Sequence, residues 1–150
     1  MKLGADHVLF GLGIAAAAIG LWFFVLAISS WAGGWARLAR SHRAPEPPAA
    51  GLARWLSGRF GVVSYSGVLA MRVDDLGLTL SAMWMFRPFH PPLFVPWHAL
   101  QGDEVRSFLT RCVRLRFPDA PGVSAVFCGM SATLLRPYLD RMSRGSRRRP

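Results

Sequence analysis

Apolar residues form one unbroken run near the amino terminus of this chain and short alternating runs after it. The first run, Val8 to Ile28, has 21 residues without a charged side chain. As an α-helix it would be roughly 31 Å long, which matches the hydrocarbon core of a bilayer. The pattern predicts one transmembrane helix.

The residues that follow this run predict its orientation. Trp31 and Trp35 lie where indole rings prefer the edge of a bilayer, and Arg37, Arg40 and Arg43 come next. The positive-inside rule then places the amino terminus outside and the remainder in the cytoplasm. A cleaved signal peptide is the alternative, although its apolar part usually has only about 7 to 15 residues and follows the positive charge.

Small residues recur at a spacing of four within the apolar run. Gly13 and Ala17 form one such pair, and Ala16 and Gly20 form another. This spacing lets two helix backbones approach closely, so it is a candidate face for a homodimer or for another membrane protein. The alternative is an ordinary helix that faces lipid.

The spacing of apolar residues changes after a basic, Pro-rich linker, which we assign to residues 37–57. From about residue 58, apolar positions alternate with period two, which is typical of antiparallel strands. Residues 69–73 and 78–84 alternate on either side of the turn Asp74–Gly77 and predict a hairpin. Residues 93–97 predict a short strand that Pro96 confines to an edge or a bulge, and a further strand is expected from about 99 to 108.

The clearest strand pair comes last. If the numbers of opposed residues add to 240, Val113 and Leu115 meet Phe127 and Ala125 on one apolar face. This register also makes Cys112 and Cys128 neighbours. In a reducing cytosol we expect two free thiols, and a redox-sensitive bond is the alternative.

An apolar stripe near the carboxyl end predicts a helix from about Ser131 or Thr133 to Met142. The fold class is therefore one amino-terminal transmembrane helix plus a mainly antiparallel β domain with a terminal helix. The corresponding segments are 1–36 for the membrane helix and its flanks, 37–57 for the linker, 58–142 for the β domain, and 143–150 for a basic, disordered tail.

Several segments carry a resemblance to a known group of proteins. They are Trp35 through Pro45-Glu46-Pro47-Pro48, then Ser57 to Phe60-Gly61, Gly77-Leu78-x-Leu80, and above all His90-Pro91-Pro92-Leu93-Phe94-Val95-Pro96-Trp97. Over about residues 8–142 the chain resembles small bacterial single-pass membrane proteins with a pleckstrin-homology-like domain. The resemblance implies a bent sheet or half-barrel closed by one helix, and it implies no activity. In the first hairpin only Arg59 and Arg72 could contribute to an inositide site of the eukaryotic kind.

The net charge of +10 arises after the apolar run, because the only charged side chains in the first 36 residues, Lys2 and Asp6, cancel. An anionic lipid surface is the partner we favour for the basic clusters, while a solvated tail is the alternative. Nucleic acid is disfavoured, because aromatic residues are not interleaved with the basic ones. The candidate lipid-facing residues are Arg37, Arg40, Arg43, Arg144, Arg147, Arg148 and Arg149.

Sequence motifs for catalysis are absent, so we expect no enzyme, no catalytic residue and no cofactor. His90 and His98 would be roughly 26 Å apart along an extended strand, too far to share a metal ion unless the loop folds back, so no metal site is expected. Asp74 and Asp75 are assigned to a turn and not to paired catalytic carboxylates.

Aromatic residues gather around the Pro-rich segment and form a candidate partner patch, with core packing as the alternative. They are Phe86, Phe89, His90, Phe94 and Trp97. Together these observations predict a membrane-anchored interaction or scaffold module whose cytoplasmic β domain binds a protein partner or an anionic lipid surface. The alternative is a small accessory subunit of a larger inner-membrane complex, held by its transmembrane helix.

Overall fold

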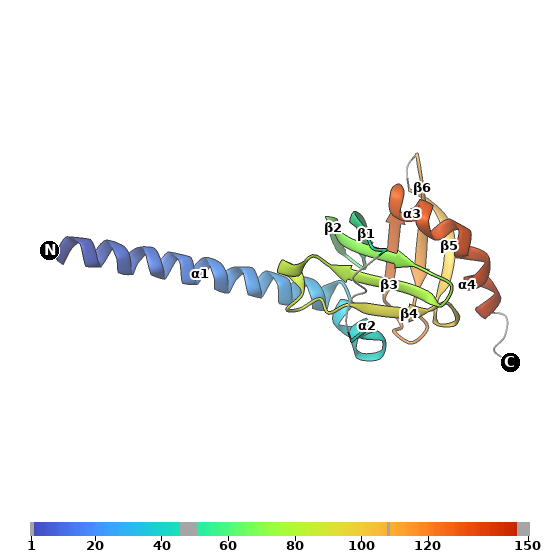
Figure 1. Cartoon of the computed structure of the whole chain (residues 1–150), viewed down its shortest axis with the longest axis horizontal. Helices are drawn as coiled ribbons and strands as arrows, with labels where there is room; N and C mark the ends of the chain where they lie inside the picture. Colours follow the sequence, from blue (N-terminus) through green and yellow to red (C-terminus); the bar gives the residue numbers. More distant parts are fainter. Residues whose placement is uncertain (1, 46–50, 108, 147–150) are drawn as a thin grey trace.

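One long helix projects from a curled antiparallel sheet (Figure 1). The computed structural model describes residues 2–45, 51–107 and 109–146. The helix α1 (Lys2–Ala32) is followed by the short helix α2 (Trp35–His42). The seven strands are β1 (Ala53–Phe60), β2 (Val63–Val73), β3 (Gly77–Ala82), β4 (Leu93–Pro96), β5 (Gln101–Ser107), β6 (Thr110–Arg116) and β7 (Ser124–Cys128).

The sheet has the strand order β4-β3-β2-β1-β7-β6-β5 and curls into a half-barrel. All neighbouring strands run antiparallel, so the sequence prediction of a mainly antiparallel domain is confirmed. Strand β4 is an edge strand, as Pro96 predicted, because a residue without an N–H cannot donate to a further neighbour. The pairing of β1 with β7 joins the two halves of the sheet.

Both predicted hairpins form. In the first, the side chain of Asp74 accepts the N–H groups of Leu76 and Gly77 at 3.0 and 3.1 Å, which fixes the turn between β2 and β3. In the second, Cys112 pairs with Cys128 and Val113 with Phe127, and the pairing continues in this register to Arg116 and Ser124. The predicted register is therefore confirmed. The expected continuation of β3 to Trp84 is wrong, because β3 ends at Ala82 and Trp84 begins the 3₁₀ helix η1 (Trp84–Phe86).

Helix α1 does not continue smoothly into the segment that we assigned to a linker. Gly34 has φ +80°, a left-handed conformation that breaks the helix between α1 and α2. The turn brings Trp35 and Leu38 of α2 into the core, where both are completely buried. Residues 37–42 of the predicted linker therefore belong to the packed helix α2, and residues 53–57 belong to β1.

The carboxyl-terminal helix is built in three pieces and not one. They are α3 (Met130–Leu135), the 3₁₀ turn η3 (Arg136–Tyr138) and α4 (Leu139–Ser146). Pro137 explains the interruption, since it lies in the first turn of η3, where its missing N–H is tolerated. Helix α4 packs on β5 at Gly102, where a Cβ atom would come within 2.9 Å of Leu139.

The two cysteines are joined by a disulfide bond, so the expectation of two free thiols is wrong for this structure. Their Cα atoms are 4.2 Å apart on the adjacent strands β6 and β7, a separation typical of a pair without hydrogen bonds between strands. At this position the two sulfur atoms are within bonding reach without rearrangement of the sheet.

Candidate functional site

The end of α1 is joined to the sheet by polar contacts that are mostly shielded from solvent. The hydroxyl of Ser30 donates to the carbonyl of Phe89 at 2.6 Å, and the indole N–H of Trp35 donates to the carbonyl of Pro91 at 2.9 Å. Both acceptors lie in the loop between β3 and β4. These contacts connect residues more than fifty positions apart and hold the loop against the helix.

We call the contacts of Ser30, Trp35, Tyr65 and His90 at the end of α1 the joint, and Tyr65 and His90 lie at its centre. The Nδ1 atom of His90 is 3.1 Å from the carbonyl oxygen of Phe86, which can only accept, so Nδ1 carries the proton. Nε2 therefore accepts a hydrogen bond from the hydroxyl of Tyr65 at 2.8 Å. The structure thus selects one tautomer of a neutral imidazole.

Burial favours the neutral form of both side chains. His90 is completely buried, which lowers its pKa, although the bond to Phe86 offsets part of that effect. Burial raises the pKa of Tyr65 to about 12. Neither group is placed to exchange protons with solvent, so we assign the pair to structure and not to catalysis.

Aromatic rings surround the pair and complete the joint. Trp35 packs against Phe60, Tyr65 and His90 with ring centroids 5.0 to 6.0 Å apart. Such a cluster of buried rings holds α2 on the sheet, because any tilt of α2 would separate several contacts at once. Helix α1 is joined to the adjoining loop by Ser30 and by the ring contacts of Phe86 and Phe89.

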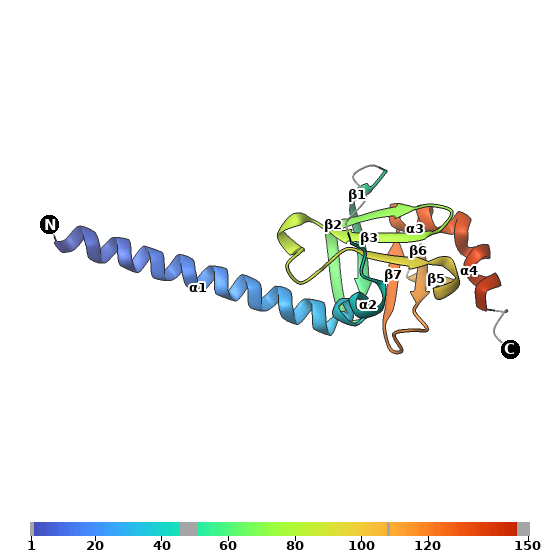
Figure 2. The same cartoon turned by 60° about the horizontal axis from the view of Figure 1, so that its bottom comes forward.

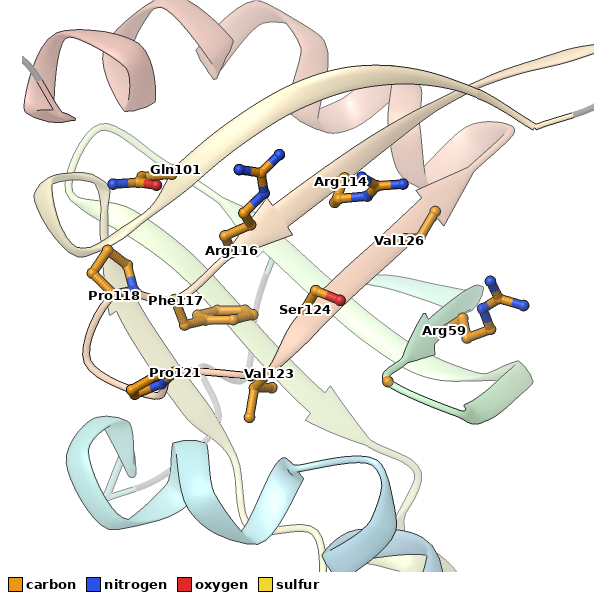
Figure 3. Close-up of a pocket in the computed structure, with 12 residues that line it drawn as sticks. Arg59, Gln101, Arg114, Arg116, Phe117, Pro118, Pro121, Val123, Ser124 and Val126 are labelled. Atoms are coloured by element: carbon orange, nitrogen blue, oxygen red, sulfur yellow. The ribbon is translucent and has the colours of Figure 1, made fainter.

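An open groove of about 590 Å³ lies on the outer face of the sheet, across β1, β7 and β6. Arg59 pairs with Val126, and Val126 pairs with Arg114, so these three side chains point to the same face. Arg116, two residues farther along β6, lies beside Ser124 on that face. Figure 3 shows the three arginine side chains around the groove, with α2 running past its lower end.

The groove is strongly basic. Arg59, Arg114 and Arg116 are all exposed, and Arg116 forms an ion pair with Asp103 at 2.6 Å. The polar groups of Gln101 and Ser124 also line the groove. Guanidinium groups with neighbouring hydroxyl and amide groups are suited to binding phosphate.

One end of the groove lies beside the end of α1. A Cβ atom on Gly61 would lie 3.5 Å from the carbonyl oxygen of Ala32, and one on Gly34 would lie 2.7 Å from Val123. Both Gly61 and Val123 line the groove. Since Ala32 is four residues beyond the apolar run, the near end of the groove is only about 6 Å past that run along the helix axis.

The predicted lipid-facing arginines fall into two groups. Arg37 and Arg40 are exposed on α2, and Arg37 lies beside Gly122 at the near end of the groove. Arg43 is also exposed, and its backbone forms a bridge to β4. Arg144 belongs to α4, which lies at the end of the domain away from α1 (Figure 2), while Arg147, Arg148 and Arg149 lie outside the described residues.

The predicted partner patch is divided by the structure. Phe86 and Phe89 contact α1, whereas His90 is buried in the joint. Trp97 is also buried, stacks on Tyr138 and donates to the carbonyl of Asp74 at 2.9 Å. Phe94 lies on β4 in another hollow, so the five residues do not form one surface.

The predicted helix-packing face of Gly13, Ala16, Ala17 and Gly20 is open in the part of the chain that the structure describes. Gly13 and Gly20 have no atom within 4 Å of an added Cβ, and Ala16 and Ala17 are exposed.

Metal ligands do not converge in the described part of the chain. No group of three or more His, Cys, Asp or Glu side chains there could hold a metal ion. His90 is occupied by Tyr65 and Phe86, and His98 lies in the separate hollow that Phe94 lines.

Sequence reasoning missed the basic groove as a unit. The register of the last hairpin placed Arg114 and Arg116 on one face, but not Arg59. Their meeting depends on the pairing of β1 with β7, which are more than sixty residues apart in the chain. No local pattern of alternation signals such a pairing.

Comparison with known protein families, with curated proteins and with solved structures gives no match to this chain. The function is therefore argued from the geometry alone.

Proposed function

We propose that this protein is a membrane-anchored module whose β domain binds anionic lipid headgroups at the bilayer surface. Helix α1 is the anchor, since it has the length and apolar character that a membrane span needs. The joint holds the domain next to that anchor. The order of the strands and the terminal helix supports the likeness to pleckstrin-homology domains.

The position of the basic groove carries the proposal. Three exposed arginines line it, and its near end abuts the residues at which α1 would leave the bilayer. Arg37 and Arg40 extend the basic surface along α2. Near an anionic membrane, each such cation contributes on the order of 1 kcal/mol of attraction. A phosphate group from a lipid would reach this groove without leaving the membrane surface.

We further propose that the amino terminus lies outside a bacterial inner membrane and the domain in the cytoplasm. The arginines after α1 favour this orientation. The disulfide favours the opposite one, because such bonds are rare in the cytosol. We give precedence to the arginines, because the charge bias of the flanking segments sets the orientation when the helix inserts.

The test is binding of short-chain phosphatidylglycerol by the full chain in a nonionic detergent, followed by native mass spectrometry. Short-chain phosphatidylcholine serves as the uncharged comparison. We expect Arg59→Gln/Arg114→Gln to weaken phosphatidylglycerol binding about tenfold or more, because a hydrogen bond to a charged group contributes about 1.5 to 3 kcal/mol.

The matched control is Arg106→Gln/Arg111→Gln, which removes the same charge at the far end of the β5–β6 hairpin, where both side chains are exposed. This variant should bind phosphatidylglycerol like the parent chain. Equal losses in the two variants would mean that only net charge matters, and the groove would then not be a binding site.

A further inference from the structure

The loop between β3 and β4 extends along α1 toward its amino terminus in both views (Figures 1 and 2). Its rings contact the helix well inside the apolar run. Phe86 lies 5.6 Å from Trp22 and Phe89 lies 6.1 Å from Phe23, measured between ring centroids. The loop therefore lies beside the part of α1 that we assign to the membrane.

The depth of this contact follows from helix geometry. Trp22 and Phe23 precede Ile28, the last residue of the apolar run, by six and five residues. At 1.5 Å per residue they lie between about 8 and 9 Å inside the end of the run. Interfacial protein segments bury their apolar faces about 5 to 10 Å into the boundary of headgroups and acyl chains.

The loop also exposes apolar side chains that nothing in the described part of the chain covers. Trp84 is 74% exposed and Met85 is 41% exposed. Trp55 is 71% exposed and lines the same hollow as Trp84, together with Arg54 and Arg87. We call Trp55, Trp84, Met85 and Phe89 the loop patch.

The backbone at Trp55 is strained, although its side chain lies outside the core. It has φ +62°, and no other non-glycine residue in the described ranges has a positive φ. The register of β1 against β2 shifts between Ala53 and Leu56, so Trp55 lies in a bulge. A left-handed tryptophan is costly, and an exposed one gains no compensation from packing in the core.

We propose that the loop patch inserts into the bilayer interface beside α1, as a second membrane contact of the domain. The occupant is lipid, because Phe89 of the patch contacts Phe23, and Phe86, the neighbour of Met85, contacts Trp22. The patch therefore adjoins the apolar part of α1 that we assign to the bilayer. Tryptophan prefers the interface, and Arg54 and Arg87 line the hollow beside Trp55 and Trp84, where their guanidinium groups are available to lipid phosphates. This inference depends on the proposed membrane anchor.

The experiment is photocrosslinking of the full chain in vesicles of phosphatidylcholine and phosphatidylglycerol. The variants are Met85→p-benzoylphenylalanine in the patch, Ile14→p-benzoylphenylalanine in α1, and Leu76→p-benzoylphenylalanine as the control. Leu76 is exposed in the β2–β3 turn, and its neighbour Asp75 bonds Arg141 of α4 at 2.7 Å, at the end of the domain away from α1. Lipid adducts are counted by mass spectrometry.

We expect adducts at positions 14 and 85, with a yield at 85 at least about fivefold above that at 76. Adducts at 14 but not at 85 would overturn the insertion of the loop and leave the anchor standing. A protein adduct at 85 in place of lipid would also overturn it. No lipid adduct at 14 would refute the anchor itself, and the inference with it.

Discussion

His90 lies between Tyr65 and the carbonyl of Phe86, and a neutral imidazole with its proton on Nδ1 satisfies both contacts. These contacts require the tautomer with the proton on Nδ1, and the residue lies at the joint between helix and sheet. In the sequence it was a member of an aromatic patch and was weighed with His98 as a metal ligand, and neither interpretation indicates its contact with Tyr65. The partner Tyr65 lies 25 residues away, so no local spacing links the two.

We predict that the free energy of unfolding falls as the pH drops below about 6.5, the ordinary pKa of histidine. Burial lowers the pKa of His90 in the folded state, so the unfolded chain takes up the proton first. Above that range both states are neutral and this contribution to pH dependence is absent. Denaturant unfolding of the full chain in detergent at pH 7.5 and pH 5 measures the effect.

The control for this prediction is His90→Gln, which cannot titrate and retains the other histidines. Its unfolding free energy should change less between the two pH values than that of the parent chain. An identical pH dependence in both proteins would show that His90 has no part in it.

At the scale of elements, the last hairpin was predictable to the residue and the helix junction was not. The hairpin is local, and the alternation of Val113, Leu115 and Phe117 permits one register that buries all of them. The break at Gly34 depends on tertiary packing, because only the burial of Trp35 and Leu38 requires α2 to turn onto the sheet. Likewise, Trp84 continues the alternation of β3 but leaves the strand to follow α1.

We predict that Gly34→Ala destabilises the domain more than Gly67→Ala. Both residues have a positive φ, +80° and +66°, so each alanine costs about 1 to 2 kcal/mol of backbone strain. At Gly34 the added Cβ also meets Val123 at 2.7 Å, whereas nothing lies within 4 Å at Gly67. We expect an additional cost of about 1 to 3 kcal/mol at Gly34, measured by denaturant unfolding. Equal losses would contradict the packing of the junction.

We predict that Gly13→Leu/Gly20→Leu leaves lipid binding and domain stability unchanged. These glycines have open space around them and lie far along α1 from the joint. Native mass spectrometry of phosphatidylglycerol adducts and the unfolding midpoint check the prediction. If the protein acts instead as a subunit held by this helix face, the variant would release its membrane partner while the domain stayed folded.

For the whole molecule, the arginines after α1 favour a cytoplasmic domain, whereas the disulfide favours a domain on the outer side. The redox state of the two cysteines in the cell distinguishes these orientations. We predict that Cys112 and Cys128 are thiols in intact cells, because the proposed orientation places them in the cytoplasm. Membrane-permeant alkylation before lysis, followed by mass spectrometry, should find both modified. A bond already present in untreated cells would place the domain on the outer side and contradict the orientation.

The class of the fold followed from periodicity, since one apolar run and a series of short alternating runs admit few other architectures. The candidate site did not follow, because the groove joins β1 to β7 and β6 across long stretches of chain. Helix α4 lies at the end of the domain away from α1, whereas the groove lined by Arg59, Arg114 and Arg116 has its near end beside Ala32 of α1.

The most direct test of the account is the lipid and protein content of the full chain purified from membranes in a mild detergent. We predict that anionic lipid is enriched over its share of the source membrane, and that the enrichment is lost in Arg59→Gln/Arg114→Gln but kept in Arg106→Gln/Arg111→Gln. A stoichiometric protein partner with no lipid enrichment would contradict the account and identify the protein as a subunit of a larger complex.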